Sequence, residues 1–355
     1  MGLVANLVLL LLLVVVLFVF WPKISALVQL AQTYISNPLA KYNFTLPSNI
    51  INSTNIYPQA NQSRSFGTIL NYTLEVINKD RSAYGLQNVT LSAEPSAQQH
   101  ADSMLQYNYL SHWDTYGMKP YMRYTLLGGT GAMQENVAYR KSGVRACIGN
   151  LCSNYGNINI TSAIANLEYN MTNNDSACCN NGHRDNILNP EHNQVSIGVA
   201  FNSTNIYLVE DFINNYVTWL NSTPSFSNGE VYLKGVAMQG YGLSSVEVTY
   251  DQPAANMTVS QLNQTREYGY GNSVAGVVGS SIDYYPNLTT IVADSYYSSG
   301  SDFIARFSMN KLINQYGPGE YTILVWLNDS NSSFIGSSYT VFIDQNGNPY
   351  TPRDV

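Results

Sequence analysis

The first 21 residues are the feature that most limits how this chain can be arranged. Every position from Leu7 to Trp21 is apolar, and no charged residue comes before Lys23. As a helix, the stretch from Leu3 to Trp21 would extend about 28 Å, which is enough to cross a bilayer. A cleaved signal peptide is the alternative, but signal peptides normally begin with basic residues, have a shorter apolar core and end at a small-x-small site. We therefore predict an uncleaved transmembrane anchor over residues 1–22.

The rest of the chain has the composition of a protein exposed outside the cell. Only 11% of the 355 residues are charged, the formal net charge is −7, and the sequence has no cluster of Lys and Arg, which argues against a nucleic-acid partner. Asn-x-Ser/Thr triplets, the acceptor sequence for N-linked glycans, could supply the missing polarity. They begin at Asn43, Asn52, Asn61, Asn71, Asn88, Asn159, Asn170, Asn174, Asn202, Asn221, Asn256, Asn263, Asn287, Asn328 and Asn331. We predict a single-pass protein of the cell membrane whose bulk is extracellular and glycosylated.

The four cysteines, Cys147, Cys152, Cys178 and Cys179, lie within one short region. An even number of cysteines is typical of disulfides in an oxidising compartment. A zinc cluster is the alternative, although the adjacent pair does not have C-x-x-C spacing. We expect two bridges that join the first two cysteines to the last two, with the connectivity open.

Two regions of different character follow a spacer rich in Pro, Asn and Ser, which we place at residues 23–65. Residues 66–222 mix helical and strand patterns, which predicts an α+β domain. Helices are expected at about 70–84, at 92–109 with Ser92 as N-cap, at 161–171 and from 183 onward, and strands at 134–139, 195–201 and 205–212.

Arg81 lies on the apolar stripe of the first of these helices. A buried cation is costly unless it is paired, so we expect a carboxylate partner. A side chain that extends its charged end into solvent is the alternative.

Beyond Pro224 the sequence contains seven strand-like runs separated by Gly, Asn, Ser and Pro turns. They span residues 231–238, 246–250, 274–279, 289–294, 303–309, 321–327 and 339–343. Their number and alternating pattern predict an all-β sandwich of immunoglobulin-like type over residues 223–355, with the role of a spacer or adhesion module.

Ordinary catalytic motifs, such as G-x-S-x-G, H-E-x-x-H or a phosphate-binding loop, do not occur in the sequence. The candidates for chemistry are His112, Glu135 and His183, each at the end of a predicted element. Two imidazoles and a carboxylate suit a divalent metal with an open fourth position, or they can hold a water between an acid and a base. The ordinary structural interpretation is a turn histidine and a carboxylate at the end of an element.

The blocks that contain these residues are SHWDTYG, QENVA, and NNGHRDNIL followed by VSIGVAF. They resemble the CAP superfamily (SCP domain) of cysteine-rich secretory proteins, antigen 5 and pathogenesis-related 1, and the G-H-R-x-N-I-L block resembles its prokaryotic branch. The resemblance implies an α-β-α sandwich whose cleft is lined by two His and two acidic residues, where some members bind zinc or other divalent ions. His112, Glu135 and His183 carry over. The second acidic residue of the family's cleft corresponds to a position near Asn170 in this sequence. Glu168 is the carboxylate nearest to that position and is the candidate for this role.

The resemblance implies a membrane-anchored extracellular binding or cell-surface interaction module. Its ligand would be a lipid or a protein, and its cleft could hold Zn²⁺ or another divalent metal. A non-catalytic role fits the family better than turnover. One alternative is a metal-dependent hydrolase of peptides or surface polymers, with His112 and His183 as ligands and Glu135 as ligand or general base. Another is a structural, glycosylated envelope protein.

Overall fold

The computed structural model describes residues 62–141, 145–148, 151–154, 158–265, 267–283 and 285–352. The predicted anchor over residues 1–22 lies outside the described residues, as does nearly all of the predicted spacer over residues 23–65. Residues Arg64–Val355 belong to one compact unit. Within the described part of the chain, no helix has the length and apolar character that spanning a membrane requires.

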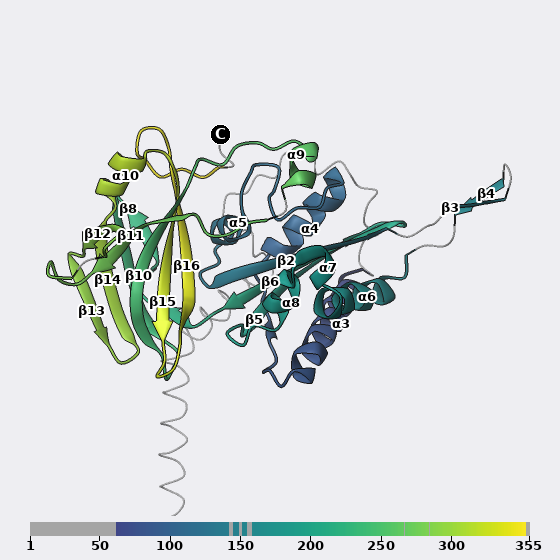
Figure 1. The fold of residues 1–355 in the computed structure, drawn as a ribbon, viewed down its shortest axis with the longest axis horizontal. Helices are drawn as coiled ribbons and strands as arrows, with labels where there is room; N and C mark the ends of the chain where they lie inside the picture. Colours follow the sequence, from purple (N-terminus) through teal and green to yellow (C-terminus); the bar gives the residue numbers. More distant parts are fainter. Residues whose placement is uncertain are drawn as a thin grey trace, which may run out of the picture. The chain divides into compact units, whose positions relative to one another are not determined.

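A four-stranded sheet forms the centre of the N-terminal half of this unit (Figure 1). Its strands are β1 (Thr90–Leu91), β2 (Ala132–Lys141), β5 (Gln194–Phe201) and β6 (Asn205–Asn214). The strand order is β1-β5-β6-β2, so that β2 is an edge strand. β1 pairs in parallel with β5, and the other pairs are antiparallel. The three strands that the sequence predicts in this region are confirmed.

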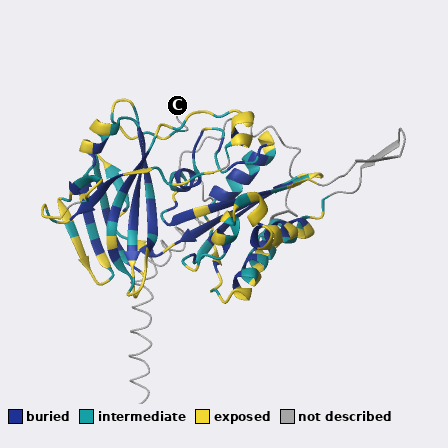
Figure 2. Cartoon of the chain, viewed as in Figure 1, coloured by how far each residue is buried: buried dark blue, intermediate teal, exposed yellow. Residues whose placement is uncertain are grey.

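Helices cover both faces of the sheet. They are α3 (Gln62–Ala83), α4 (Ser96–Tyr107), α6 (Ile160–Asn173) and α8 (Gly182–Ile187). Side chains alternate along β6: Ile206 and Leu208 join the core formed with α3, α6 and α8, whereas Tyr207 and Val209 join the core formed with α4. The buried strands between partly exposed helices are visible in Figure 2. This half is a mixed α+β fold with helices on each side of a sheet.

The predicted helix cap at Ser92 is wrong. α4 begins at Ser96, with Pro95 at the N-cap position and no side-chain cap. The carboxylate of Glu94 accepts the backbone N–H of Ser96 at 3.0 Å, and the Ser92 hydroxyl accepts the N–H of Glu94 at 3.3 Å. Because Glu94 supplies an acceptor at the start of the helix, Ser92 serves the preceding turn instead.

The predicted carboxylate partner of Arg81 is also wrong. The buried guanidinium donates hydrogen bonds to four backbone carbonyl oxygens, those of Gln87, Ile187, Asn189 and His192, at 2.9, 2.6, 3.0 and 3.1 Å. Ile187 is the last residue of α8, and the last carbonyl groups of a helix have no partner inside it. These oxygens carry a partial negative charge, so they compensate the buried cation without a carboxylate.

The C-terminal half is a β-sandwich of two sheets. Its strands are β7 (Val217–Trp219), β8 (Ser225–Ser227), β9 (Glu230–Ala237), β10 (Gly242–Asp251), β11 (Asn272–Val278), β12 (Thr289–Val292), β13 (Ser295–Ser299), β14 (Asp302–Ser308), β15 (Gly319–Asn328) and β16 (Ser333–Ile343). One sheet has the order β12-β11-β10-β15-β16, and the other has β13-β14-β9-β7, with β8 also paired to β9. In chain order, this arrangement is similar to the C″-C′-C-F-G and D-E-B-A sheets of a variable-type immunoglobulin sandwich, except that β11 and β12, at the C′ and C″ positions, pair in parallel.

A buried tyrosine is a second point of similarity to immunoglobulin-like sandwiches. The hydroxyl of Tyr321, near the start of β15, donates to the carbonyl oxygen of Gly317 at 2.6 Å, just after α10 (Asn310–Tyr316). Such a bond at the entry to strand F is the tyrosine corner of immunoglobulin-like sandwiches. Each of the seven strand runs predicted from the sequence overlaps an observed strand.

The two halves share an apolar core. Tyr121 and Met122 of α5 (Pro120–Leu126) pack in one cluster with Ile213 of β6 and Phe342 of β16. The Ser338 hydroxyl donates to the carbonyl oxygen of Gly131 at 3.1 Å. β7, which precedes the predicted domain boundary at 222/223, already pairs with β9 of the sandwich. Packing between the halves is therefore continuous.

The connection from β10 to β11, residues 252–271, crosses onto the α+β half, and we call it the strap. It contains α9 (Val259–Gln264), whose Leu262 joins the core formed with α4. The backbone N–H of Leu110 donates to Asn263 Oδ1 at 3.0 Å, and the N–H of Met257 donates to the carbonyl oxygen of Thr115 at 2.9 Å. The strap thus lies against the loop that carries His112.

Candidate functional site

His112 lies in the loop between α4 and α5, and its imidazole faces Glu135 of β2. Nδ1 of His112 is 3.0 Å from Oε1 of Glu135. The other carboxylate oxygen, Oε2, accepts a hydrogen bond of 2.7 Å from Nη2 of Arg123. Nη1 of Arg123 donates to the carbonyl oxygen of His112 at 2.7 Å. The structure brings together two of the predicted site residues and adds a buried cation that holds both.

Burial sets the protonation state of this group. Burial, followed by the interactions with His183 and Arg123, lowers the pKa of His112 to about 3, so this imidazole is neutral near pH 7. Burial raises the pKa of Glu135 to about 7, against the opposing effect of Arg123. A neutral imidazole whose Nδ1–H faces a carboxylate keeps its lone pair on Nε2. His112 can therefore act as a ligand or acceptor through Nε2.

A second carboxyl group supports Glu135 from the neighbouring strand. Asp211 of β6 is the register partner of Glu135, and the two side chains are hydrogen-bonded. Burial, and then the charge of Glu135, raise the pKa of Asp211, so that Asp211 keeps its proton and donates it to Glu135. This shared proton explains why Oδ1 of Asp211 has no conventional donor among the described residues. The pair behaves as one negative charge facing Arg123.

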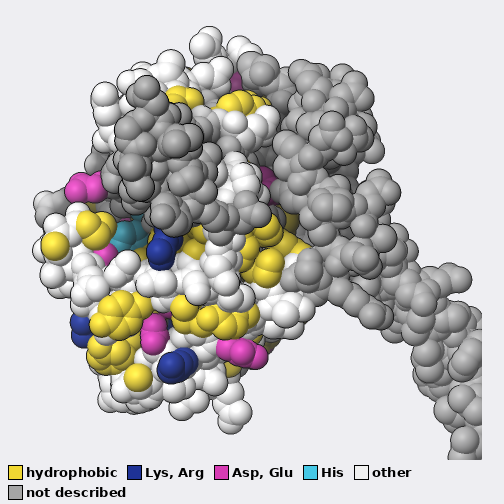
Figure 3. All heavy atoms as spheres, turned by 90° about the vertical axis from the view of Figure 1, so that its right-hand side faces the viewer, with side chains coloured by type: hydrophobic (Ala, Val, Ile, Leu, Met, Phe, Trp, Pro, Cys, Tyr) yellow, Lys and Arg dark blue, Asp and Glu magenta, His cyan; other side chains and the backbone are white. Residues whose placement is uncertain are grey.

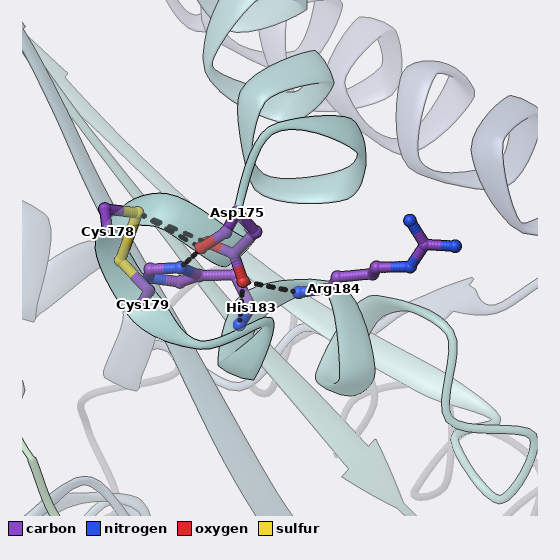
Figure 4. The surroundings of a disulfide bond; sticks show 5 residues. All are labelled: Asp175, Cys178, Cys179, His183 and Arg184. Carbon is purple, nitrogen blue, oxygen red and sulfur yellow. Dashed lines mark hydrogen bonds and ion pairs between the residues drawn. A yellow bond between two sulfur atoms is a disulfide. The ribbon is translucent and has the colours of Figure 1, made fainter.

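His183 lies in the first turn of α8 and is held by Asp175 (Figure 4). Oδ1 of Asp175 is 2.7 Å from Nδ1 of His183, and Oδ2 accepts the backbone N–H groups of His183 and Arg184 at 2.8 and 3.2 Å. N–H groups in the first turn of a helix have no partner inside it, so one carboxylate both caps α8 and orients the imidazole. Among the described residues, the hydrogen bond of the His183 ring uses Nδ1, which leaves Nε2 for another partner.

The local sequence explains why Asp175 meets a residue eight positions later. α7 (Ser176–Cys179) is one short turn of helix, and it is followed by Asn180 and Asn181 with φ of 50° and 66°. Asparagine adopts this left-handed conformation more readily than most residues. The chain therefore reverses between α7 and α8, and residue 175 comes to lie beside residue 183.

The two histidines approach from opposite faces of the edge strand β2. Glu135 and Asn136 are neighbours on this strand, so their side chains point to opposite faces. Nδ2 of Asn136 donates to the carbonyl oxygen of His183 at 3.3 Å, which places His183 on the face opposite Glu135. The imidazoles are still near enough for His183 to lower the pKa of His112. The carboxylate partner of His183 is Asp175, not Glu135.

Glu168, the fourth predicted ligand, lies buried on α6 and faces Glu210 of β6. Burial, followed by the charge of Glu210, raises its pKa, and the two carboxyl groups share a hydrogen bond. Neither oxygen of Glu168 has a conventional donor among the described residues, as expected for a shared proton. The structure pairs this carboxyl group with Glu210, whose own pKa is raised by burial against an opposing interaction with His183.

The predicted disulfide pairing is wrong for Cys178 and Cys179, which form a disulfide with each other on α7. The backbone of the hairpin formed by β3 (Arg145–Ile148) and β4 (Leu151–Asn154) pairs Cys147 with Cys152. Each pair of cysteines thus lies within one local element, either α7 or the β3–β4 hairpin.

The disulfide lies directly beside His183 (Figure 4). One potential ligand atom from each of Asp175, Cys178, Cys179 and His183 lies within 4.8 Å of the others. Carboxylate oxygen, imidazole nitrogen and thiolate sulfur all bind zinc. This group could hold a metal ion, and it shares only His183 with the set predicted from the sequence.

The strap adds a tyrosine to the site. The ring of Tyr268 lies 4.7 Å from the His112 imidazole between centroids, and its hydroxyl accepts the backbone N–H of Glu135. A cavity of about 420 Å³ lies between the two halves; Trp113, which follows His112 in the sequence, lines it, whereas His112 and Tyr268 do not. Its lining includes Trp113, Lys119, Met122, Asp251 and Met257. Arg123, Asp175 and Tyr268 are thus site residues that the sequence did not indicate.

The family model that matches this chain falls within the α+β half. A family model described as the cysteine-rich secretory protein family, CAP, matches residues 74–218. A solved structure of an extracellular protein containing an SCP domain from Bacillus anthracis strain Ames is 18% identical, with a TM-score of 0.29, over 40% of this chain and 38% of that chain. The CAP domain of enterococcal PrgA is 16% identical, with a TM-score of 0.28, over 48% of this chain and 66% of that chain.

The chain thus spans less than two thirds of either solved structure. Among curated proteins, none matches the chain. The match of the family model rests on a stretch that contains β2, α8 and the loop carrying His112, which are the elements that build the site. Residues 74–218 of this chain are therefore similar to the CAP family.

Proposed function

We propose that this chain is a membrane-anchored extracellular protein whose CAP domain acts as a binding module and holds a divalent metal ion, Zn²⁺ first among them, between His112 and His183. One observation carries the proposal: each imidazole has its Nδ1 against a buried carboxylate, Glu135 or Asp175. Histidines that bind metals in proteins are oriented in this way by a carboxylate on the second ring nitrogen.

The residues around the site orient the two imidazoles that would bind the metal ion. Two Nε2 atoms would bind the ion, which when bound would leave positions open for an oxygen atom of a partner molecule. Arg123 fixes the loop of His112 through its carbonyl oxygen, and Tyr268 covers the imidazole ring. Glu135 lies behind His112 with both oxygens engaged, which suits orientation of the imidazole more than proton transfer. This arrangement favours binding over turnover.

The adjoining cavity supports a ligand that is partly apolar. Trp113, Met122 and Met257 contribute apolar walls, and the ammonium group of Lys119 lies 2.6 Å from Oδ1 of Asp251. A polar pair beside apolar walls is common in sites that fix the orientation of a largely apolar ligand. A lipid, or an apolar segment of a protein, fits this chemistry.

The exposure of the glycan acceptor sites supports an extracellular location. Of the fifteen triplets, all but those at Asn43, Asn52 and Asn61 lie in described residues, and in each of the remaining twelve the asparagine is exposed. The buried asparagines 136, 186 and 214 belong to no triplet. Figure 3 shows scattered charged side chains on the face that it displays, among larger areas that are neither charged nor hydrophobic.

Calorimetric titration of the purified full chain with Zn²⁺ tests the proposal, with its cysteines kept oxidised. We expect one ion per chain, and binding weaker by about tenfold or more in His112→Ala and in His183→Ala, because each variant removes one ligand. Asp185→Asn is the matched control, since this exposed carboxylate lies on α8 two residues beyond His183. Equal affinity in the control and both histidine variants would rule out the metal site.

A further inference from the structure

Four potential metal ligands meet where α7 joins α8 (Figure 4). Sγ of Cys178 is 3.6 Å from Oδ1 of Asp175, the same oxygen that lies 2.7 Å from Nδ1 of His183. Cys178 is exposed and Cys179 is half-buried, whereas Asp175 is buried. The sulfur atoms can thus be reached from solvent, while the carboxylate is fixed from the protein side.

Reduction of the disulfide would change what this group can bind. In the disulfide neither sulfur is a thiolate, and the thiolate is the form that ligates metals. A reducing dithiol can attack one sulfur, form a mixed disulfide, and then release the second sulfur by closing its own disulfide. The dithiol loses two electrons and two protons, and Cys178 and Cys179 gain them as two thiols. When a metal binds, these thiols release two protons to solvent.

We propose that Cys178, Cys179, His183 and Asp175 form a redox-gated site that binds Zn²⁺ only when the two cysteines are reduced. Two thiolates, one imidazole and one carboxylate complete the four-coordinate set that zinc prefers. Thiolate ligands also select zinc over magnesium or calcium.

The position of the Asp175 carboxylate fits this role. Backbone N–H groups of α8 occupy Oδ2, so Oδ1 faces the sulfur and the imidazole. Ligand atoms on one zinc ion lie within about 4 Å of one another, given bonds of about 2.0–2.3 Å. A set of four atoms already within 4.8 Å needs only small side-chain rotations to reach that spacing once the sulfurs separate.

This site is separable from the metal site of the proposed function. The proposed cleft site needs Nε2 of both His112 and His183, whereas the thiolate site takes nothing from His112. Changing His112 therefore removes one site and leaves the other intact, and changing the adjacent cysteines does the reverse. The inference stands or falls independently of the proposed function.

The test titrates the full chain with Cd²⁺, a heavier analogue of Zn²⁺ whose bonds to thiolates absorb in the ultraviolet. One sample is reduced with a phosphine, freed of reductant without air and titrated, while an oxidised sample is titrated in parallel. We expect the reduced chain to bind one Cd²⁺ with thiolate absorption that Zn²⁺ competes away, and the oxidised chain to show no such absorption. Reduced wild-type chain without the absorption band would overturn the proposal.

Variants then assign the band to its ligands. The double variant Cys178→Ser, Cys179→Ser should lose it, and the matched double variant Cys147→Ser, Cys152→Ser should keep it. A band that survives in the first double variant, or that only the second abolishes, would also overturn the proposal. Because oxidised and reduced wild-type chains have one sequence, their comparison stays decisive if a variant fails to fold.

Two histidine variants separate the two metal sites. His112→Ala should keep the thiolate band at full intensity, although it removes the cleft ligand. His183→Gln should weaken Cd²⁺ binding by about tenfold or more, because it removes the imidazole ligand. Loss of the band in His112→Ala would show that the thiols do not bind metal with the ligands named here.

Discussion

The two halves of the compact unit bury polar groups in different ways. The α+β half buries Arg81, Arg123, Glu135, Glu168, Glu210 and Asp211, together with His100 and His192. Among the described residues of the sandwich, the buried polar side chains are Ser and Thr with one carboxylate, Glu320. The half that carries the candidate chemistry therefore depends on specific hydrogen bonds of buried ionisable groups, whereas the sandwich depends on apolar packing. Three substitutions test this contrast.

The largest effect is expected from Arg123→Met, which leaves Glu135 without its buried cation. Breaking one partner out of a buried pair typically costs about 3–5 kcal/mol of the free energy of unfolding. We expect a loss of this size above the pKa of Glu135 and a smaller loss below it, because Glu135 can then take up a proton. Urea unfolding of wild type and variant, once above and once below the pKa of Glu135, measures the two losses of stability.

Arg306→Met in the sandwich is the matched control for Arg123→Met. Arg306 pairs with Glu230 on the exposed surface, where ion pairs contribute little. A change in unfolding midpoint as large as that of Arg123→Met would contradict the contrast between the halves.

Glu320 should make the sandwich lose stability as the pH rises. Burial raises its pKa from 4.5 to about 7, so the folded chain holds this proton more tightly than the unfolded chain. The stabilisation is complete below pH 4.5 and is lost as the pH rises through about 7, by up to about 1.4 kcal/mol per pH unit. Glu320→Gln removes the titration, so the wild type should lose stability relative to the variant as the pH rises through this window. A constant difference in urea unfolding midpoints would contradict the assignment.

The smallest effect is expected from Tyr321→Phe, which removes the hydroxyl of the tyrosine corner. The lost hydrogen bond to Gly317 should lower the free energy of unfolding by about 1 kcal/mol. Tyr297→Phe, on an exposed tyrosine of β13, should leave it unchanged. Equal thermal midpoints for the two variants would show that the corner contributes nothing measurable.

Regular periodicity made much of the fold predictable. The apolar runs of β5 and β6, which are buried along most of their length, and the alternation in β9 and β14 can both be seen in neighbouring residues. His112 and Glu135 could be located because each lies in a recognisable sequence block. The start of α4 was misplaced because the carboxylate of Glu94, two residues beyond Ser92, serves its first turn.

The partners of the site residues could not be predicted in the same way. Tyr268 reaches Glu135 from 133 positions along the chain, and no local pattern encodes such a contact. Asp175 does have a local signal, since an Asp before a short helix is a typical capping residue, but its bond to His183 depends on the left-handed turn between α7 and α8. The sequence pattern indicates that Arg81 is buried but does not indicate its partners. These partners are backbone carbonyl oxygens, which every residue type has.

The shared core between the halves has a practical consequence for recombinant work. A fragment truncated at the end of the family match, near residue 218, would expose Tyr121 and Met122 to water and would lack Tyr268 beside His112. Newly bared apolar surface of this kind promotes self-association. Failure of such a fragment to bind metal or a partner would therefore reflect the cut, and the whole unit Arg64–Val355 keeps the pocket walls together.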